Sequence, residues 1–482
     1  MKQAKKEKAK TLKIPKVKVV PSTKVHSLTF PDQRIYLESV KLDGQPAFLH
    51  KDGLTGRLDF MKEFVYDGIT YAPAEPLGYL PCEFDSKKDE VNKPIKLDVV
   101  TKLILNEWKT FVACDDTWRI LNTAYTVLTY LVSKSMTTPY LAYFGDTETG
   151  KGQRKTLHRQ MSYRANAGVL ATAANIFIYS ENVKGTLIQD EFESVERDRD
   201  LQALFKEGYK QGASVMRIRT NRDGVPIQHD YQVFSCKIVV SNYAIRNKAV
   251  LERFIVELTT KEKPKKDEFD RSSDLKRFAE IRKQLMTWRL QTIWNSLPDL
   301  DISFTGRAKE LYKPLLQAVH GTSLYEPLLE FLTTLEAKAI EEAKSSLTAL
   351  VTKACVKLRE KQCPTEELRT VLADYMNGTI VMKSDVPYGI RSSEYGTITD
   401  MQIVNEIKLN LGGKKARPYV HTSEVLPTSG EVRQVRGWDT DATRLLNMVK
   451  KYHLEGDADI GEELKELEYS VAVNQEAVKG FG

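Results

Sequence analysis

Several features that would indicate a membrane, secreted or zinc-binding protein are scarce or missing in this 482-residue chain. No run of apolar residues approaches the length of about 18 that a membrane-spanning helix needs. The lysine-rich start lacks an apolar segment of signal-peptide type, so we expect a cytoplasmic protein without a membrane partner. The seven histidines are scattered. No C-x-x-C pair occurs, and the odd number of cysteines favours reduced thiols over a zinc site or a disulfide framework. The five cysteines are Cys82, Cys114, Cys236, Cys355 and Cys363.

Positive charge is concentrated in one segment. The formal net charge of the chain is +7, and residues 1–24 contain nine lysines against the single acid Glu7. The rest of the chain is therefore close to neutral, and the overall charge does not by itself indicate a DNA-binding surface. We expect residues 1–24 to form a disordered basic tail, which either grips phosphate backbones or only solubilises the chain.

A glycine-rich loop after the apolar run 140–144 is the strongest motif. It reads Gly145-Asp146-Thr147-Glu148-Thr149-Gly150-Lys151-Gly152-Gln153, with the spacing G-x-x-x-x-G-K of a phosphate-binding P-loop. The glycines let backbone N–H groups face an anion, a following helix adds partial positive charge, and Lys151 adds a full one. We predict that residues 145–153 bind ATP. The alternative is a plain glycine-rich turn before a helix.

One position of the loop departs from the motif. Gly152 stands where a Ser or Thr hydroxyl normally holds Mg²⁺. Thr149 and Thr156 lie nearby, but neither has the register that the motif requires. The departure therefore leaves the metal geometry and the turnover rate open.

Three later segments supply the other groups that an ATPase needs. The run 185–191 ends in two carboxylates, of which Asp190 is placed to hold Mg²⁺ and Glu191 to polarise the attacking water. The run 236–242 ends in Asn242, which would orient that water, and Arg253 directly precedes a fourth strand-like run. This order predicts a β-α-β NTPase core.

With these motifs, the chain resembles an additional-strand P-loop ATPase of the AAA+ type. More narrowly, it resembles the replicative helicase-like ATPases of archaeal and bacterial plasmids, viruses and integrated elements. The resemblance spans residues 96–320, and the stretches that carry it are 137–151, 185–191, 208–217 and 307–316. It implies ATP and Mg²⁺ bound between the subunits of a homo-oligomeric ring, a hexamer. It also implies that Arg253 reaches the neighbour's γ-phosphate, with Arg246 as the competing candidate.

Residues 214–233 alternate around Asn221-Arg222-Asp223-Gly224, which is a hairpin signature. Ring helicases of this kind place a β-hairpin in the central pore. The resemblance thus implies that Arg217, Arg219, Arg222 and His229 contact the phosphates of single-stranded DNA. The alternative is a surface hairpin with solvated arginines.

The predicted fold is an α/β P-loop NTPase core, AAA+ like, with a helical lid, an N-terminal β-rich module and a C-terminal winged-helix-like domain. Arg307, which begins a lid helix, is placed like a second sensor of phosphate, although lid arginines often only pair with carboxylates. The expected segments are a basic tail (1–24), the β-rich module (25–95), the core with its leading helices (96–259), the lid (260–345), the winged-helix-like domain (346–455) and an acidic flexible tail (456–482).

We therefore expect an ATP-dependent DNA motor, a ring-forming replicative helicase or replication initiator of a mobile genetic element. One alternative is an AAA+ loader or switch that binds ATP and DNA without processive unwinding, and Gly152 favours it. The other is a DNA-binding regulator whose P-loop has weakened, against which the presence of both Asp190 and Glu191 argues.

Overall fold

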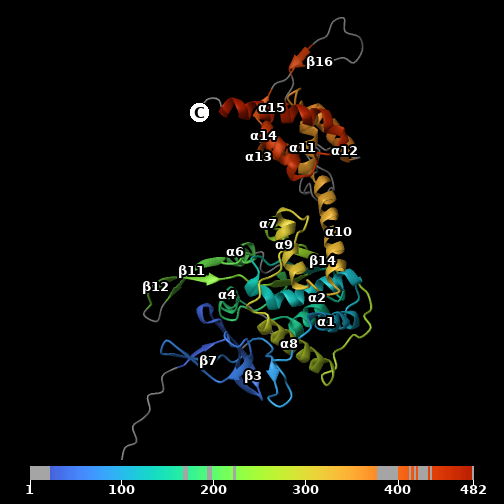
Figure 1. The fold of residues 1–482 in the computed structure, drawn as a ribbon. Coiled ribbons are helices and arrows are strands. Elements are labelled where there is room, and N and C mark those ends of the chain that lie inside the picture. The colour runs from blue at the N-terminus through green and yellow to red at the C-terminus, as the bar shows by residue number, and fades with distance from the viewer. Residues whose placement is uncertain are drawn as a thin grey trace, which may run out of the picture. The chain divides into compact units, whose positions relative to one another are not determined.

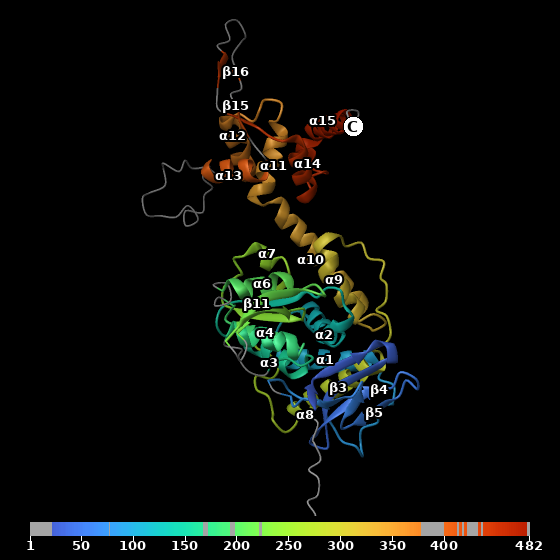
Figure 2. The same cartoon turned by 90° about the vertical axis from the view of Figure 1, so that its left-hand side faces the viewer.

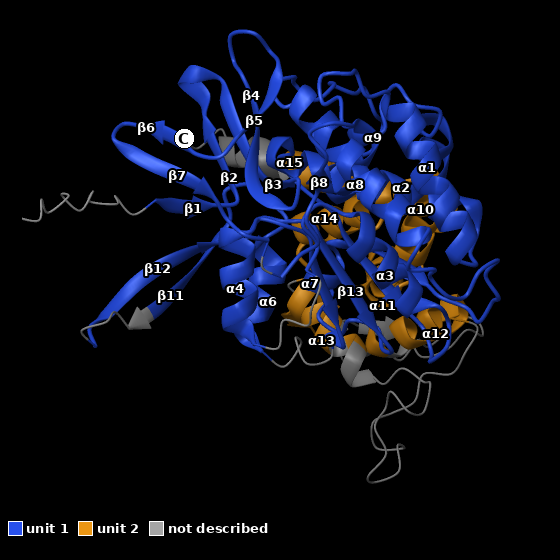
Figure 3. Cartoon of the chain, turned by 90° about the horizontal axis from the view of Figure 1, so that it is seen from below, with its two compact units in different colours: residues 1–332 blue, residues 333–482 orange. Residues whose placement is uncertain are grey.

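The structure is a computed structural model, and the chain divides into two compact units, residues 1–332 and 333–482 (Figure 3). Arg222 and residues 1–21 of the expected basic tail lie outside the described residues. Within the described ranges, no helix has the length and apolar character needed to cross a membrane. The described ranges are 22–76, 78–166, 172–192, 198–220, 224–376, 400–411, 414–416, 419–421, 432–434 and 437–479.

Short strands build the N-terminal part of the first unit, in agreement with the β-rich content expected there. They form a three-stranded sheet of order β1-β7-β6 and a five-stranded sheet of order β2-β3-β4-β5, with β8 paired to β3. The strands are β1 (Thr23–Val25), β2 (Ser27–Phe30), β3 (Ile35–Leu42), β4 (Gln45–Lys51), β5 (Leu58–Met61), β6 (Phe64–Tyr66), β7 (Ile69–Pro73) and β8 (Glu83–Phe84), with the 3₁₀ turn η1 (Pro31–Gln33) after β2.

Four parallel strands form the central sheet, so the first unit is a mixed α/β structure. The strands are β9 (Tyr140–Phe144), β10 (Leu187–Asp190), β13 (Lys237–Ser241) and β14 (Phe254–Leu258), in the spatial order β10-β13-β9-β14. Every residue of β9 and β13 is buried. A parallel strand covered on both faces is expected to read as a continuous apolar run, as β9 and residues 238–240 of β13 do. Because all four strands run the same way, the residues that follow them gather at one edge of the sheet.

Helices cover both faces of this sheet. On one face, Tyr140 and Phe144 of β9 join a buried cluster with Phe177 of α4 and Phe205 of α6. On the other face, Tyr143 of β9 donates a hydrogen bond to Asn122 of α2. The helices are α1 (Leu97–Phe111), α2 (Asp116–Leu131), α3 (Lys151–Met161), α4 (Ala173–Asn182), α6 (Arg199–Glu207) and α7 (Lys248–Leu251), with the 3₁₀ turn η2 (Val132–Lys134) after α2.

Three helices follow the sheet in the segment expected to form a lid. They are α8 (Asp274–Gln291), α9 (Gly306–Ala318) and α10 (Tyr325–Lys344), and the boundary between the two units falls within α10. Helix α8 packs on α1, α2 and α3, and α9 packs on α2. Helix α8 also packs on β4 and β8, so this helix lies between the core and the N-terminal strands (Figure 2).

A buried charged cluster joins the N-terminal strands to the core. The Glu38 carboxylate of β3 accepts a hydrogen bond from Tyr163 Oη at 2.9 Å and forms an ion pair with Arg164. Arg289 of α8 lies 3.8 Å from the same carboxylate and donates to Tyr36 Oη at 2.7 Å. Since one fully buried acid is compensated by two guanidinium groups from distant segments, these strands are docked on the core.

The hairpin predicted at residues 214–233 is present. Strands β11 (Ser214–Thr220) and β12 (Pro226–Gln232) pair antiparallel from Ser214↔Gln232 to Thr220↔Pro226, and they project from the core (Figure 1). The fully buried Lys237 ties the hairpin root to β13, because its Nζ donates to the carbonyls of Gly208 at 3.0 Å and Val233 at 2.9 Å. Burial lowers the pKa of Lys237 to about 7.

The second unit is mainly helical and has its own hydrophobic core. The structure corrects the expectation of a flexible acidic tail at 456–482, because residues 461–479 form helix α15. Leu464, Leu467 and Val471 recur on one face of α15 and are buried in this core. The helices are α11 (Leu347–Lys357), α12 (Thr365–Met376), α13 (Asp400–Asn410), α14 (Ala442–Lys451) and α15 (Gly461–Lys479), with the 3₁₀ turn η4 (Ala458–Ile460).

Two short antiparallel strand pairs also belong to the second unit. They are β15 (Lys414–Ala416) with β18 (Gly437–Asp439), and β16 (Tyr419–His421) with β17 (Val432–Gln434). Helices followed by such pairs are compatible with the expected winged-helix-like domain, which stays a prediction.

Candidate nucleotide-binding site

The glycine loop lies at the edge of the sheet where β9 ends. A Cβ atom on Gly145 would lie 2.6 Å from the carbonyl oxygen of Thr259 and 3.0 Å from Thr149 Oγ1, so only glycine fits there. Gly150 has φ +80° and directly precedes α3, a left-handed conformation that glycine adopts without strain. These two glycines therefore fold the loop tightly onto the N-terminus of α3.

Lys151 brings the loop together with a strand that lies far away in the sequence. Its side chain is largely buried, and its Nζ donates to the carbonyl of Gly145, to the carbonyl of Asp146 at 2.7 Å and to Asn242 Oδ1 at 2.8 Å. Asn242 directly follows β13, the neighbour of β9. The predicted phosphate-binding lysine and the predicted water-orienting amide thus meet at one point.

Asp190 ends β10 at the same edge, and Glu191 follows it. Asp190 forms an ion pair with Lys155 of α3, and its other carboxylate oxygen accepts a hydrogen bond from the backbone N–H of Glu191 at 3.2 Å. Glu191 has φ 53° and is exposed. A left-handed backbone costs a residue other than glycine about 1 kcal/mol or more, and such strain clusters at functional sites. Sequence reasoning missed Lys155, although its i+4 spacing from Lys151 puts both on one helix face.

A cleft of about 880 Å³ opens beside the loop, a volume that suits a small organic ligand. Residues 148–154 line it together with 111–113, 261–264 and Asp267. Glu148 pairs with Lys261 at 2.6 Å, and Gln153 donates to the carbonyl of Asp267. Thr147 of the loop is exposed. The charged segment that follows β14, at the start of the expected lid, therefore forms one wall of the cleft.

No nearby threonine replaces the hydroxyl that Gly152 lacks. Thr149 Oγ1 donates to the carbonyl of Asp146 at 2.9 Å and lies 2.7 Å from Thr259 Oγ1. Thr156 Oγ1 donates to the carbonyl of Gly152 at 2.8 Å. A Cβ atom on Gly152 would meet nothing within 4 Å, so packing does not require glycine at this position.

The donor set fits Mg²⁺ only together with a nucleotide. In the part of the chain that the structure describes, no group of three or more His, Cys, Asp or Glu residues is arranged to hold a metal ion. Mg²⁺ prefers oxygen ligands and is commonly bound by one or two carboxylates with substrate phosphates and water. Asp190 can supply the carboxylate, and the phosphates held by the loop would supply further oxygens.

A buried polar network supports the loop from behind. Arg154 of α3 pairs with Glu257 of β14 at 2.9 Å, and its Nη1 lies 3.3 Å from the carbonyl of Thr149. On the same helix, His158 Nε2 lies 2.7 Å from Tyr143 Oη, and burial lowers the pKa of His158 to about 3. Since these groups are buried and partnered, they hold α3 and the loop in a fixed position against the sheet.

Arg253 and Arg307 lie together at the opposite edge of the sheet. Both guanidinium groups stack on Tyr209, each with its Cζ 4.8 Å from the ring centroid. The carbonyl of Tyr209 accepts from the N–H of Thr138, which precedes β9, whereas the loop follows β9. The structure therefore places Arg307 away from the loop of its own chain, and its role as a sensor of phosphate stays a prediction. Its helix α9 begins next to Thr137, before β9, and Arg307 pairs there with Glu310 at 2.6 Å.

The hairpin residues expected to contact DNA have partners within the chain where the structure describes their side chains. Arg217 pairs with Asp200 at 2.7 Å and stacks on Phe177, and His229 pairs with Glu181 at 2.9 Å. Arg217 and His229 lie opposite each other in the strand register and share a face with Arg219. The side chain of Arg219 and the whole of Arg222 lie outside the description. The other face of the hairpin carries two exposed apolar residues, Met216 (62%) and Ile218 (77%).

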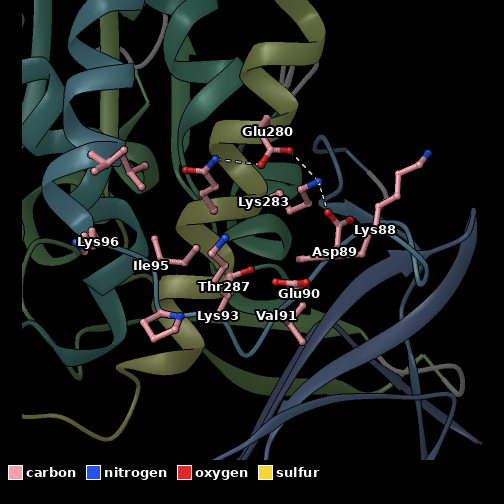
Figure 4. Close-up of a pocket in the computed structure, with 15 residues that line it drawn as sticks. Lys88, Asp89, Glu90, Val91, Lys93, Ile95, Lys96, Glu280, Lys283 and Thr287 are labelled. Carbon is pink, nitrogen blue, oxygen red and sulfur yellow. Dashed lines mark hydrogen bonds and ion pairs between the residues drawn. The ribbon is translucent and has the colours of Figure 1, made fainter.

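A second cleft, of about 540 Å³, lies between α8 and the segment 88–96 (Figure 4). Lys283 bridges Asp89 at 2.7 Å and Glu280 at 2.8 Å across it. No predicted site residue lines this cleft. We interpret its ion pairs as a structural link between α8 and the segment that leads into α1.

Comparisons with known proteins return solved structures of low sequence identity. No protein-family model matches the chain, and no curated protein matches it. The A-form apo structure of the NrS-1 C-terminal region is 13% identical with a TM-score of 0.32, and covers 83% of this chain and 95% of that one. The SCCmec type IV Cch active helicase is 11% identical with a TM-score of 0.36, and covers 88% of this chain and 80% of that one. Both TM-scores are low, so neither similarity establishes a shared fold or activity.

Proposed function

We propose that this chain is an ATP-hydrolysing enzyme that acts on DNA. The observation that carries the proposal is the hydrogen bond of Lys151, which lines a cleft of about 880 Å³, to Asn242. Asp190 ends the strand next to β13 at the same edge of the parallel sheet and pairs with Lys155 of the helix that Lys151 begins. A glycine loop, an acidic strand end and a polar strand end in this arrangement are the parts that phosphoryl transfer requires.

Each residue has a distinct role in this proposal. The N–H groups of loop 145–150 and the Lys151 ammonium hold the phosphates, and Asp190 holds Mg²⁺ directly or through water. When bound, the metal neutralises charge on the phosphates. Glu191 polarises the attacking water, and Asn242 orients it. The order β10-β13-β9-β14 places β13 between the loop strand and the acidic strand, which supports an additional-strand ATPase of the AAA+ type.

The position of Arg253 supports an oligomer. An arginine at the far edge of the sheet is too distant from its own loop, but a neighbour's loop can approach it in a ring. We propose that Arg253 stabilises the charge that develops on the neighbour's γ-phosphate, within a homo-oligomeric ring that is a hexamer. Arg307, which shares Tyr209 with Arg253, would add positive charge to the same interface.

The hairpin is the proposed DNA contact. The carboxylate pairs of Arg217 and His229 are partly exposed, so DNA phosphates can replace the carboxylates, and Met216 and Ile218 offer apolar contact to bases. Strand β13 begins with Lys237, which binds the hairpin root, and is directly followed by Asn242. Changes at the nucleotide would reach the hairpin along this strand. A replicative helicase or initiator of a mobile element is the role we favour.

A slow nucleotide switch is the second candidate, and two observations favour it. Gly152 provides no metal ligand, and Lys155 already neutralises Asp190. A loader of this kind would bind ATP and DNA without processive unwinding. A regulator with a weakened P-loop would not turn over at all.

Strand displacement on a forked DNA substrate separates these functions. We expect ATP-dependent release of the labelled strand by the wild-type chain and none by Lys151→Ala, which loses the charge that holds phosphate. Turnover without strand release would favour the switch, and absence of ATP binding would refute the proposal.

A further inference from the structure

We propose that Lys155 is a built-in cation at the nucleotide site, which competes with Mg²⁺ for Asp190 and lets the chain bind ATP before a metal arrives. This inference rests on the proposed function. It assigns a positioning role to a residue outside the P-loop motif, and it explains how a loop with Gly152 can work.

The Lys155 ammonium occupies the Asp190 carboxylate oxygen that a metal ion would otherwise bind. Lys151 and Lys155 occupy successive turns of α3 and reach the ends of β13 and β10, respectively. The Lys155 side chain is 19% exposed and that of Asp190 is 33% exposed, so the pair is mostly shielded from water. One Asp190 oxygen is bound by Lys155, and the other accepts from the Glu191 backbone.

The missing hydroxyl and the extra lysine fit together. An ammonium group has three donors and no acceptor, so it can bind Asp190 and a phosphate oxygen at once but cannot bind a metal ion while charged. The open space around Gly152 would accept a serine. The site therefore offers a second positive charge to the phosphates in place of a hydroxyl ligand for Mg²⁺.

Two consequences follow for binding. Lys151 and Lys155 together supply two positive charges, so the chain should bind ATP in the absence of divalent metal. Metal binding at Asp190 must displace Lys155, so the metal should tighten ATP binding only weakly. A partly shielded ion pair is worth about 1 kcal/mol, which corresponds to a roughly fivefold penalty on the metal.

The test is a titration of a fluorescent ATP analogue, N-methylanthraniloyl-ATP, in EDTA and in saturating Mn²⁺. The measured quantity is the Kd in EDTA divided by the Kd in Mn²⁺, and this measurement requires no turnover. We expect a ratio near one for the wild type and a rise of roughly fivefold for Lys155→Met. Lys155→Arg, which keeps the charge, should keep the ratio near one, and adding Asp190→Asn to Lys155→Met should return the ratio to near one.

Gly152→Ser gives an independent measurement. The space around Gly152 accepts the side chain, and the added hydroxyl supplies the metal ligand that the motif normally has, so this variant should also raise the ratio. An unchanged ratio in Lys155→Met, with both variants folded by circular dichroism, would overturn this inference alone. Absence of analogue binding by the wild type in both buffers would overturn the proposed function, and the inference with it.

Discussion

Arg253 and the nucleotide loop occupy opposite edges of one sheet, and this separation makes a quantitative prediction. The backbone N–H of Tyr140, at the start of β9, donates to the carbonyl of Arg253, which is therefore level with Pro139. The loop begins six residues later, at Gly145. At about 3.3 Å per residue the gap is roughly 20 Å, which a single arginine side chain does not span.

The experiment places the loss of Arg253 and the loss of Glu191 on different subunits of one ring. Arg253→Ala keeps the nucleotide site intact but removes the arginine finger, which is the side chain proposed to reach the neighbour's γ-phosphate. Glu191→Gln keeps this arginine but removes the carboxylate that polarises the attacking water. Each variant alone should lose about 10³-fold or more in turnover. In rings mixed at random in equal amounts, about a quarter of interfaces join an intact Glu191 to an intact Arg253, so about a quarter of wild-type turnover should return.

The assay is steady-state ATP hydrolysis by the two variants, alone and after co-refolding or subunit exchange. Mixed assembly is verified by native mass spectrometry with one variant isotopically labelled. If verified mixed rings show no recovery, Arg253 does not act on the neighbouring site. Near-normal turnover by Arg253→Ala alone would refute the finger role itself.

Three further predictions concern stability, pH and DNA. Glu38→Ala leaves two buried guanidinium groups uncompensated and should lower the free energy of unfolding by about 3–5 kcal/mol in urea titrations. The exposed Lys88→Ala, as control, should leave the midpoint unchanged. The pKa of His158 is lowered to about 3, so between pH 6.5 and 3 the unfolded chain binds the proton and the folded chain does not. Stability should therefore fall by about 1.6 kcal/mol from pH 6.5 to 5, and His158→Gln should flatten this dependence; an equal slope in both chains would contradict the assignment. Ile218→Ser should reduce DNA stimulation of ATP hydrolysis several-fold without changing DNA-free turnover, whereas Val65→Ser, at an exposed position of the N-terminal strands, should change neither; equal effects of the two would argue against the hairpin contact.

The four core strands could be predicted because the local signals are strong. Residues 140–144 are apolar and lead directly into the glycine loop, and Asp190 and Asn242 each end a buried run. Parallel strands bring such ends together at one edge of the sheet, which explains why Lys151 meets Asn242. The hairpin at 214–232 follows in the same way from its alternating pattern and turn residues.

The rest depends on contacts between distant residues, which spacing does not reveal. Arg307 begins a helix as expected, but its place next to Tyr209 is set by how α9 packs beside the start of β9. Nothing in the sequence around Glu38 indicates that Arg164 and Arg289 are its partners. The helix α15 was missed because its acids suggested a solvated tail, although Leu464, Leu467 and Val471 form an apolar stripe.

ATP hydrolysis by the purified wild-type chain, with and without single-stranded DNA and next to Glu191→Gln, tests the central claim most directly. The account predicts turnover by the wild type, faster turnover when DNA is added, and none by the variant. ATP hydrolysis that DNA does not stimulate, or a Glu191→Gln variant as active as the wild type, would contradict it.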